Sequence, residues 1–113
     1  MHEYPITLKI IEIAEAHARK ENASRVVKVN LVVGDYSGFI GESISMYFNH
    51  ISEGTLCEGA QIAIRRVVPQ LKCKSCGEYF TRRPFSFECP HCGEEGGPTE
   101  IGKEFYIESI EVQ

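Results

Sequence analysis

Between residues 6 and 19, apolar side chains recur at steps of three and four, which is the spacing of one face of an α-helix. Charged residues occupy the opposite side, and Pro5 fits the first turn of a helix, where a missing N–H has no cost. The pattern predicts an amphipathic helix over residues 6–19. Its core-facing stripe comprises Ile6, Ile10, Ile13, Ala14 and His17.

Two later stretches have the patterns of β-strands. Residues 25–33 are rich in valine, which predicts a mostly buried strand. Residues 60–68 alternate between two faces and stop at Pro69, which predicts a second strand. A shorter helical pattern lies between them and ends near Gly54. Its apolar positions are Ile44, Tyr47, Phe48 and Ile51.

Residues 104–112 again have the composition of a strand. Their apolar positions change parity between Ile107 and Ile110, which predicts a β-bulge near Glu108 or Ser109. The simplest arrangement pairs this strand with the two earlier ones. The sequence therefore predicts an α+β fold, with a small three-stranded sheet and two helices.

Residues 69–100 differ in composition from the rest of the chain. They hold four of the five cysteines and few bulky apolar side chains, so they cannot build much of a hydrophobic core. We expect this segment to be a small module inserted into the α+β domain. The predicted division is an α+β domain of residues 1–68 and 101–113, and an inserted domain of residues 69–100.

The four cysteines of the insertion form two Cys-x2-Cys pairs, separated by twelve residues. Such pairs place four thiolates around one ion, and this tetrahedral sulfur site is the one that Zn²⁺ prefers. A closed four-cysteine site is typical of structural rather than catalytic zinc. Residues 79–80 and 85–87 resemble the two short strands of a zinc ribbon. The predicted zinc ligands are Cys73, Cys76, Cys89 and Cys92.

The fifth cysteine and two of the histidines are interpreted as ordinary residues of the fold. Cys57 stands sixteen positions before the first pair and reads as a buried small apolar residue. His17 reads as a packed or partly exposed helix residue. His91 lies inside the second cysteine pair and reads as an exposed loop histidine, although it could replace a cysteine as a ligand.

The net charge of the chain limits the kinds of molecule that it is expected to bind. Twelve Lys and Arg against sixteen Asp and Glu give a net charge of −4, which is the wrong sign for a protein that binds phosphate backbones over a broad face. No apolar run approaches the roughly 18 residues of a membrane span. The opening residues lack the basic character of a signal peptide. We therefore expect a cytoplasmic protein that binds neither nucleic acid nor membrane.

The first residues, Met1-His2-Glu3, offer a second kind of metal chemistry. A free α-amine, the neighbouring amide nitrogens and the His2 imidazole can close small chelate rings around one ion. This nitrogen-rich planar set suits Ni²⁺ or Cu²⁺. A single histidine after the initiator methionine is a weak signal on its own, because chance polar residues are common at chain ends.

Several features together resemble the hydrogenase nickel-incorporation proteins of the HypA/HybF family. They are Met1-His2-Glu3, the helix after it, the valine-rich strand with Val32-Val33-Gly34, and the two late cysteine pairs. The resemblance spans nearly the whole chain. It implies a metallochaperone, not an enzyme, that delivers Ni²⁺ for maturation of [NiFe]-hydrogenase, and in some members of urease.

The resemblance also implies partners and ligands. The partners are a HypB-type GTPase and the hydrogenase large subunit or its maturation complex. His2, helped by the N-terminal backbone, is the nickel ligand, with Glu3 contributing to the site. The four paired cysteines hold structural zinc, while nickel is transient cargo.

The sequence leaves one other function open and disfavours a second. A zinc-ribbon adaptor that binds a protein partner and never carries nickel remains the alternative. A hydrolase is disfavoured because the sequence has no Ser/His/Asp order, no paired-carboxylate signature and no phosphate-binding glycine loop.

Overall fold

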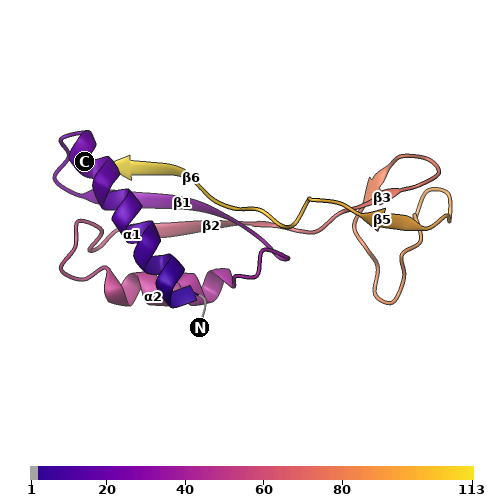
Figure 1. Ribbon diagram of the computed structural model, residues 1–113, viewed down its shortest axis with the longest axis horizontal. Coiled ribbons are helices and arrows are strands. Elements are labelled where there is room, and N and C mark those ends of the chain that lie inside the picture. Colours follow the sequence, from indigo (N-terminus) through magenta and orange to yellow (C-terminus); the bar gives the residue numbers. More distant parts are fainter. Residues whose placement is uncertain (1–2) are drawn as a thin grey trace.

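The structure is a computed structural model that describes residues 3–113 (Figure 1). Two helices and three long strands form one part of the molecule, and three short strands form the other. The elements in chain order are α1 (Glu3–Lys20), β1 (Val26–Gly34), α2 (Gly41–Ile51), β2 (Gln61–Val67), β3 (Leu71–Cys73), β4 (Tyr79–Phe80), β5 (Gly96–Pro98) and β6 (Phe105–Val112).

The long strands form the predicted three-stranded sheet, and their order is β2-β1-β6. Strands β1 and β2 run parallel and are joined through α2, while β6 pairs antiparallel with β1. Asn30 lies opposite Ser109 and the next residue, Leu31, lies opposite Ile107, so Glu108 is an extra residue in β6. The predicted β-bulge at this position is confirmed.

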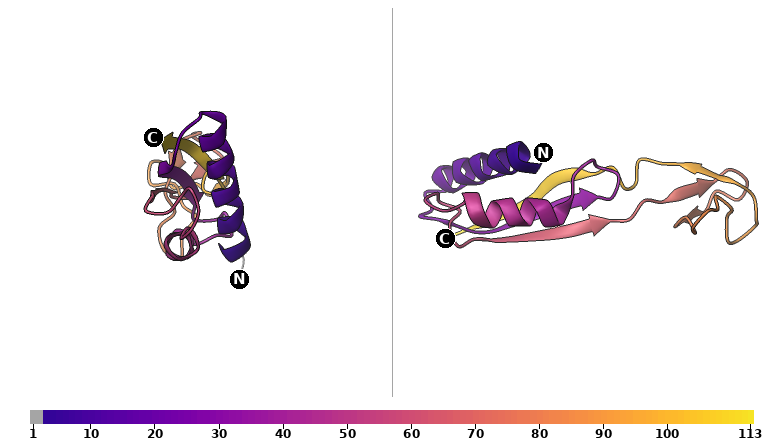
Figure 2. Two further views of the ribbon diagram at one scale, coloured as in Figure 1. Left: turned by 90° about the vertical axis from the view of Figure 1, so that its left-hand side faces the viewer. Right: turned by 90° about the horizontal axis from the view of Figure 1, so that it is seen from below.

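Both helices cover the same face of this sheet (Figure 2, right). The hydrophobic core lies between the helices and the sheet, and Phe48 and Leu31 are among its largest fully buried side chains. Most buried side chains lie on this covered face, and Val32, on the opposite face of the central strand β1, is also fully buried. The buried core residues are Ile10, Ile11, Ala14, Ala18, Val26, Val29, Leu31, Val33, Ile44, Phe48, Cys57 and Ala60.

Helix α1 differs from its prediction in length and in orientation. It begins at Glu3 rather than near Ile6, so Pro5 lies inside its first turn. The predicted core position Ile13 is wrong, because this side chain is 43% exposed. The buried face instead contains Glu3, Thr7, Ile10, Ile11, Ala14 and Ala18, and Ile13 points roughly 100° away from its centre. His17 is partly buried at its edge.

The short strands form a second sheet in the order β4-β3-β5, which together with the cysteines makes a zinc-ribbon-like module. The ribbon strand predicted at Tyr79–Phe80 is present. The one predicted at residues 85–87 is wrong, because Phe85 adopts a left-handed φ of 58° in a turn. The third strand comes from Gly96–Pro98, which pairs with β3.

The two sheets are joined by a closely packed junction of two chain segments. A Cβ on Gly34 would lie 2.1 Å from the Gly102 carbonyl oxygen, so only glycine fits at the end of β1. Gly102 itself has a φ of 107° and packs against Pro69. The Tyr36 N–H donates to the Gly102 carbonyl at 2.7 Å. The return segment is therefore fixed directly to the loop that follows β1.

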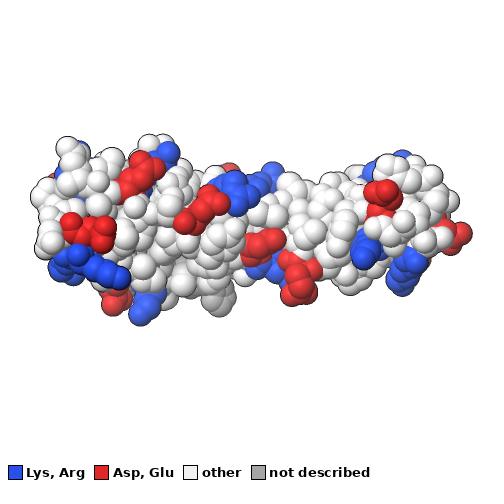
Figure 3. All heavy atoms as spheres, turned by 90° about the horizontal axis from the view of Figure 1, so that it is seen from above, with Lys and Arg blue, Asp and Glu red and all other residues white. Residues whose placement is uncertain are grey.

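The molecule is elongated, with principal extents of 55 × 28 × 16 Å, and the second sheet forms one end of it (Figure 1). None of the helices within residues 3–113 is long and apolar enough to cross a membrane. On the face shown in Figure 3, acidic and basic side chains are interspersed instead of gathering into one basic stripe.

Candidate metal centres

The two predicted cysteine pairs come together at the second sheet. All four Sγ atoms lie within 4.8 Å of one another. The Sγ atoms of Cys73 and Cys92 are 3.4 Å apart, and those of Cys76 and Cys89 are 3.7 Å apart. A tetrahedral ion with metal–sulfur bonds of about 2.3 Å requires sulfur–sulfur distances of about 3.8 Å. The cluster therefore has the dimensions of a four-thiolate metal site.

Backbone N–H groups already stabilise negative charge on this cluster. The Cys76 N–H donates to the Cys73 Sγ, and the His91 N–H donates to the Cys89 Sγ, both at 3.4 Å. The Cys76 N–H bond lowers the pKa of Cys73 to about 6. For Cys76, the Glu78 N–H lowers the pKa, but burial and the neighbouring thiols raise it to about 12. Cys73 is therefore deprotonated more readily than Cys76, whose thiolate a bound cation would favour.

The fifth cysteine lies outside this cluster. Cys57 is fully buried in the core of the α+β part, as predicted, and burial raises the pKa of its thiol to about 11. His91 is exposed within its turn. Among the described residues 3–113, the four paired cysteines form the one group of three or more side chains positioned to share a metal ion.

The second predicted site lies at the amino end, where His2 falls outside the described residues. Glu3, the first residue of α1, is only 6% exposed. Its carboxylate Oε2 accepts a hydrogen bond from the Ile40 N–H at 3.2 Å, and its carbonyl accepts one from the Thr7 hydroxyl. Ile40 is the N-cap residue of α2 and has no side-chain cap of its own. Glu3 therefore ties the start of α1 to the start of α2.

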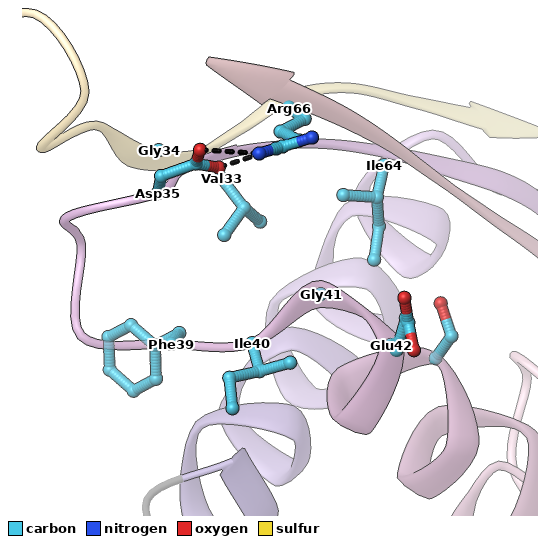
Figure 4. A pocket seen from close by; sticks show the side chains of 10 residues that line it. Val33, Gly34, Asp35, Phe39, Ile40, Gly41, Glu42, Ile64 and Arg66 are labelled. Carbon is cyan, nitrogen blue, oxygen red and sulfur yellow. Dashed lines mark hydrogen bonds and ion pairs between the residues drawn. The ribbon is translucent and has the colours of Figure 1, made fainter. Parts of the chain in front are cut away.

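A pocket of about 400 Å³ adjoins this contact (Figure 4). It lies at the carboxyl ends of the parallel strands β1 and β2, beside the start of α2, which is a common position for ligand sites in such sheets. Asp35 and Arg66 form a two-bond ion pair at its edge, with both distances 2.7 Å. Its lining residues are Val33, Gly34, Asp35, Phe39, Ile40, Gly41, Glu42, Ser45, Ile64 and Arg66.

The ion pair engages one of the two acidic side chains that line this pocket, Asp35 and Glu42. Hydrogen bonds from Arg66 lower the pKa of Asp35 and hold its carboxylate in a closed pair, so this group is already engaged. The walls contributed by Val33, Phe39 and Ile64 are apolar. The pocket therefore suits an apolar group better than a metal ion.

Comparisons with known proteins identify the family of the chain. Residues 1–112 match the family model described as "Hydrogenase/urease nickel incorporation, metallochaperone, hypA". The chain belongs to the HypA family. A hydrogenase maturation factor HypA from Caldanaerobacter subterraneus subsp. tengcongensis is 41% identical, and the match covers 100% of both chains. That from Geobacter metallireducens is 37% identical, again over 100% of both chains.

Solved HypA structures share the fold. A solution structure titled as HypA protein superposes with a TM-score of 0.69 at 26% identity, covering 100% of this chain and 97% of that one. The solution structure of the Ni metallochaperone HypA from Helicobacter pylori has a TM-score of 0.63 at 26% identity, covering 97% and 96%. The resemblance drawn from the sequence is thereby confirmed.

Sequence reasoning missed two features of the amino end. It placed Glu3 at a nickel site but gave no indication that its carboxylate would cap α2, because the contact joins residues 37 positions apart. It also gave no sign of the pocket. The unusual start of α2, which has the apolar Ile40 in place of a polar N-cap, was the available signal that a cap must come from elsewhere.

The contact between Glu3 and Ile40 can be tested by comparing two substitutions. Glu3→Ala removes the acceptor and is expected to lower the free energy of unfolding by about 1 to 3 kcal/mol, because the Ile40 N–H loses a hydrogen bond to a charged partner. Glu3→Gln keeps an acceptor oxygen and should lose less. Denaturant unfolding followed by circular dichroism measures both. Equal stability of Glu3→Ala and the unsubstituted protein would show that the contact is unimportant.

Proposed function

We propose that this HypA family member carries Ni²⁺ on its amino end for the maturation of [NiFe]-hydrogenase. The observation that supports this most strongly is the full-length match to the nickel-incorporation family, together with a chain that opens Met1-His2-Glu3. The proposed nickel ligands are His2, the N-terminal amine and the adjacent backbone nitrogens, with Glu3 contributing. The Helicobacter pylori relative is itself described as a Ni metallochaperone.

The anchored Glu3 gives this proposal a structural basis. A chelate formed by the first residues needs those residues to be held near one another, and Glu3 is fixed by its buried carboxylate. The amino end of α1 carries partial positive charge, which disfavours a cation by roughly 0.3 to 1 kcal/mol, while the Glu3 carboxylate offsets it. Such a balance favours a site of moderate affinity that can release its ion.

We further propose that the four cysteines hold structural Zn²⁺, because their spacing and chemistry fit a closed tetrahedral site. Zinc would supply the stability that the small second sheet lacks. In this proposal residues 69–100 form the zinc domain, and residues 1–68 with 101–113 form the nickel domain. The protein acts by binding and transfer, not by catalysis.

The proposed partners are a HypB-type GTPase and the hydrogenase large subunit or its maturation complex, in the cytoplasm. Urease is a second possible recipient, since the family description includes it. Transfer requires that the carrier not bind too tightly. A picomolar site would oppose transfer by about 16 kcal/mol, whereas a micromolar site opposes it by about 8 kcal/mol.

Equilibrium dialysis of the untagged, zinc-loaded chain against Ni²⁺ at neutral pH tests the carrier function. We expect one equivalent of nickel per chain in addition to zinc. A zinc-ribbon adaptor that never handles nickel would bind none. That result would replace the carrier proposal with the adaptor function.

A further inference from the structure

The loop between the two cysteine pairs contains a tight turn with an unusual residue at its tip. The Ser86 N–H donates to the Arg83 carbonyl at 3.1 Å, which closes a four-residue β-turn. Pro84 occupies its second position, and Phe85 occupies its third with a φ of 58°. Proline followed by a residue with positive φ is the pattern of a type II turn, whose third position favours glycine or asparagine.

Phe85 is unfavourable at this position for two reasons. A phenylalanine with positive φ is strained, because its Cβ crowds the backbone in the left-handed region. Its side chain is also 100% exposed, so the ring gains no hydrophobic stabilisation within the chain. A glycine would form the same turn without either cost. The fold itself therefore gives no reason for an aromatic ring here.

The turn is nevertheless well supported by its neighbours. The Phe87 carbonyl accepts a hydrogen bond from the Gly96 N–H at 2.8 Å, and the Ser86 hydroxyl oxygen accepts one from the Glu88 N–H at 3.1 Å. The Arg82 guanidinium lies over the Phe87 ring, 4.5 Å from its centroid. The Phe85 ring is thus presented to solvent on a fixed support. Such preorganisation lowers the entropy lost when a partner binds.

The charge around this ring indicates what it can contact. Residues 79–87 contain Arg82 and Arg83 and no acidic residue, in a chain whose net charge is −4. A projecting aromatic side chain with two arginines beside it complements an apolar pocket bordered by carboxylates. Aromatic and arginine side chains are also the residues enriched in the centres of protein interfaces.

A protein partner fits these features better than a membrane does. Two arginines give weak attraction to an anionic bilayer, where stable attachment needs larger basic clusters or lipid anchors. Glu88, Glu94 and Glu95 follow in the same module and oppose such attraction. A single inserted ring on a rigid turn is instead typical of a site-specific anchor between two folded proteins.

We propose that Phe85 inserts into an apolar, carboxylate-bordered pocket on the protein that receives the nickel. The identity of this partner rests on the proposed carrier function. The cysteine module forms one end of a molecule 55 Å long, away from the helices that hold the amino end (Figure 1). Contact at this module and at the amino end together fixes the orientation of the carrier on a large recipient.

The test measures binding of the zinc-loaded, nickel-free chain to a purified [NiFe]-hydrogenase large-subunit precursor by isothermal titration calorimetry. Phe85→Gly and Phe85→Asn both suit the turn, so we expect unchanged zinc content and an equal or higher unfolding temperature, together with binding weakened about tenfold or more. Arg83→Glu should also weaken binding and reduce its dependence on salt. Ile13→Ala, which removes an exposed apolar side chain from α1, is the matched control and should bind normally.

Three results would overturn this proposal. They are unchanged binding of Phe85→Gly, absence of binding by the unsubstituted chain, and Phe85-dependent sedimentation with phosphatidylcholine–phosphatidylserine vesicles in place of precursor binding. Nickel dialysis of Phe85→Gly separates this proposal from the carrier function. The variant should still take up one equivalent of nickel, since the turn lies far along the chain from the amino end. If the unsubstituted chain takes up no nickel but binds the precursor through Phe85, the carrier function is refuted and the contact made by Phe85 is not.

Discussion

Cys89→Ser is expected to abolish stoichiometric zinc binding and to unfold the cysteine module while leaving the helices and the long sheet folded. The module has almost no core of its own: its buried cluster consists of Cys73, Phe80 and Cys89, with Leu71 packed against it. Structural zinc sites contribute apparent binding free energies of about 10 to 16 kcal/mol. No contact within this module offers a comparable source of stability.

The long sheet should survive because its core is separate. Its buried residues lie between the two helices and β1, β2 and β6, and none of them comes from the cysteine module. Metal analysis and two-dimensional NMR of the backbone amides would measure the effect. Signals from residues 71–98 should collapse to the narrow range of unfolded chains, while those of β1 and β6 keep their dispersion.

Cys57→Ala is the matched control for this experiment. It also removes one thiol, but from the core of the α+β part, where Cys57 is fully buried and burial raises its pKa to about 11. This variant should keep one zinc ion and lose a modest amount of global stability. Unchanged zinc stoichiometry in Cys89→Ser would contradict the role of Cys89 as a zinc ligand. Loss of the long sheet together with the module would contradict the separation of the two cores.

The parts of the fold that the sequence predicts are those governed by local pattern. The valine run of β1 reflects a strand whose consecutive residues Leu31, Val32 and Val33 are all buried, and the parity change in β6 reflects the bulge at Glu108. The cysteine pairs are equally local, because two residues between the thiols suffice to bring them onto one ion.

The parts that could not be predicted depend on contacts between distant residues. Gly96–Pro98 has no strand propensity and becomes β5 because it pairs with β3 beside the cysteine cluster. The core face of α1 was misassigned at Ile13 because several apolar residues surround that helix, and only the sheet decides which of them it covers. The role of Glu3 depends on Ile40, which no helical or strand period connects to it.

This contact links the fold to the proposed nickel chemistry. Glu3 is the first residue of α1, and its carboxylate is fixed to the start of α2 by the hydrogen bond from the Ile40 N–H. A short chelating segment bound to a rigid element loses little entropy when it closes around an ion. The same segment on a free chain end would bind more weakly. In the proposed nickel site, the Glu3 carboxylate would therefore act as a positioning group through its contact with Ile40.

His2→Ala is expected to abolish the bound equivalent of nickel at micromolar concentrations while zinc content and unfolding temperature stay unchanged. The imidazole is the strongest side-chain donor in the proposed set, and without it the α-amine and amide nitrogens cannot complete a planar nitrogen site. His91→Ala is the matched control, because His91 is an exposed histidine of the cysteine module. It should retain nickel. Unchanged nickel stoichiometry in His2→Ala would refute the assignment.

Acidification and acetylation of the amine test the same site without changing a side chain. The imidazole and the α-amine have reference pKa values of about 6.5 and 7.7, and each binds nickel only when it is deprotonated. Nickel affinity should therefore be full above these values and fall as the pH drops through them, since protons then occupy both nitrogens. Acetylation converts the α-amine into an amide that cannot act as an amine ligand at any pH, so it should weaken nickel binding even in alkaline solution. An acetylated chain that binds nickel as tightly as the free chain would exclude the amine from the ligand set while leaving the imidazole in place.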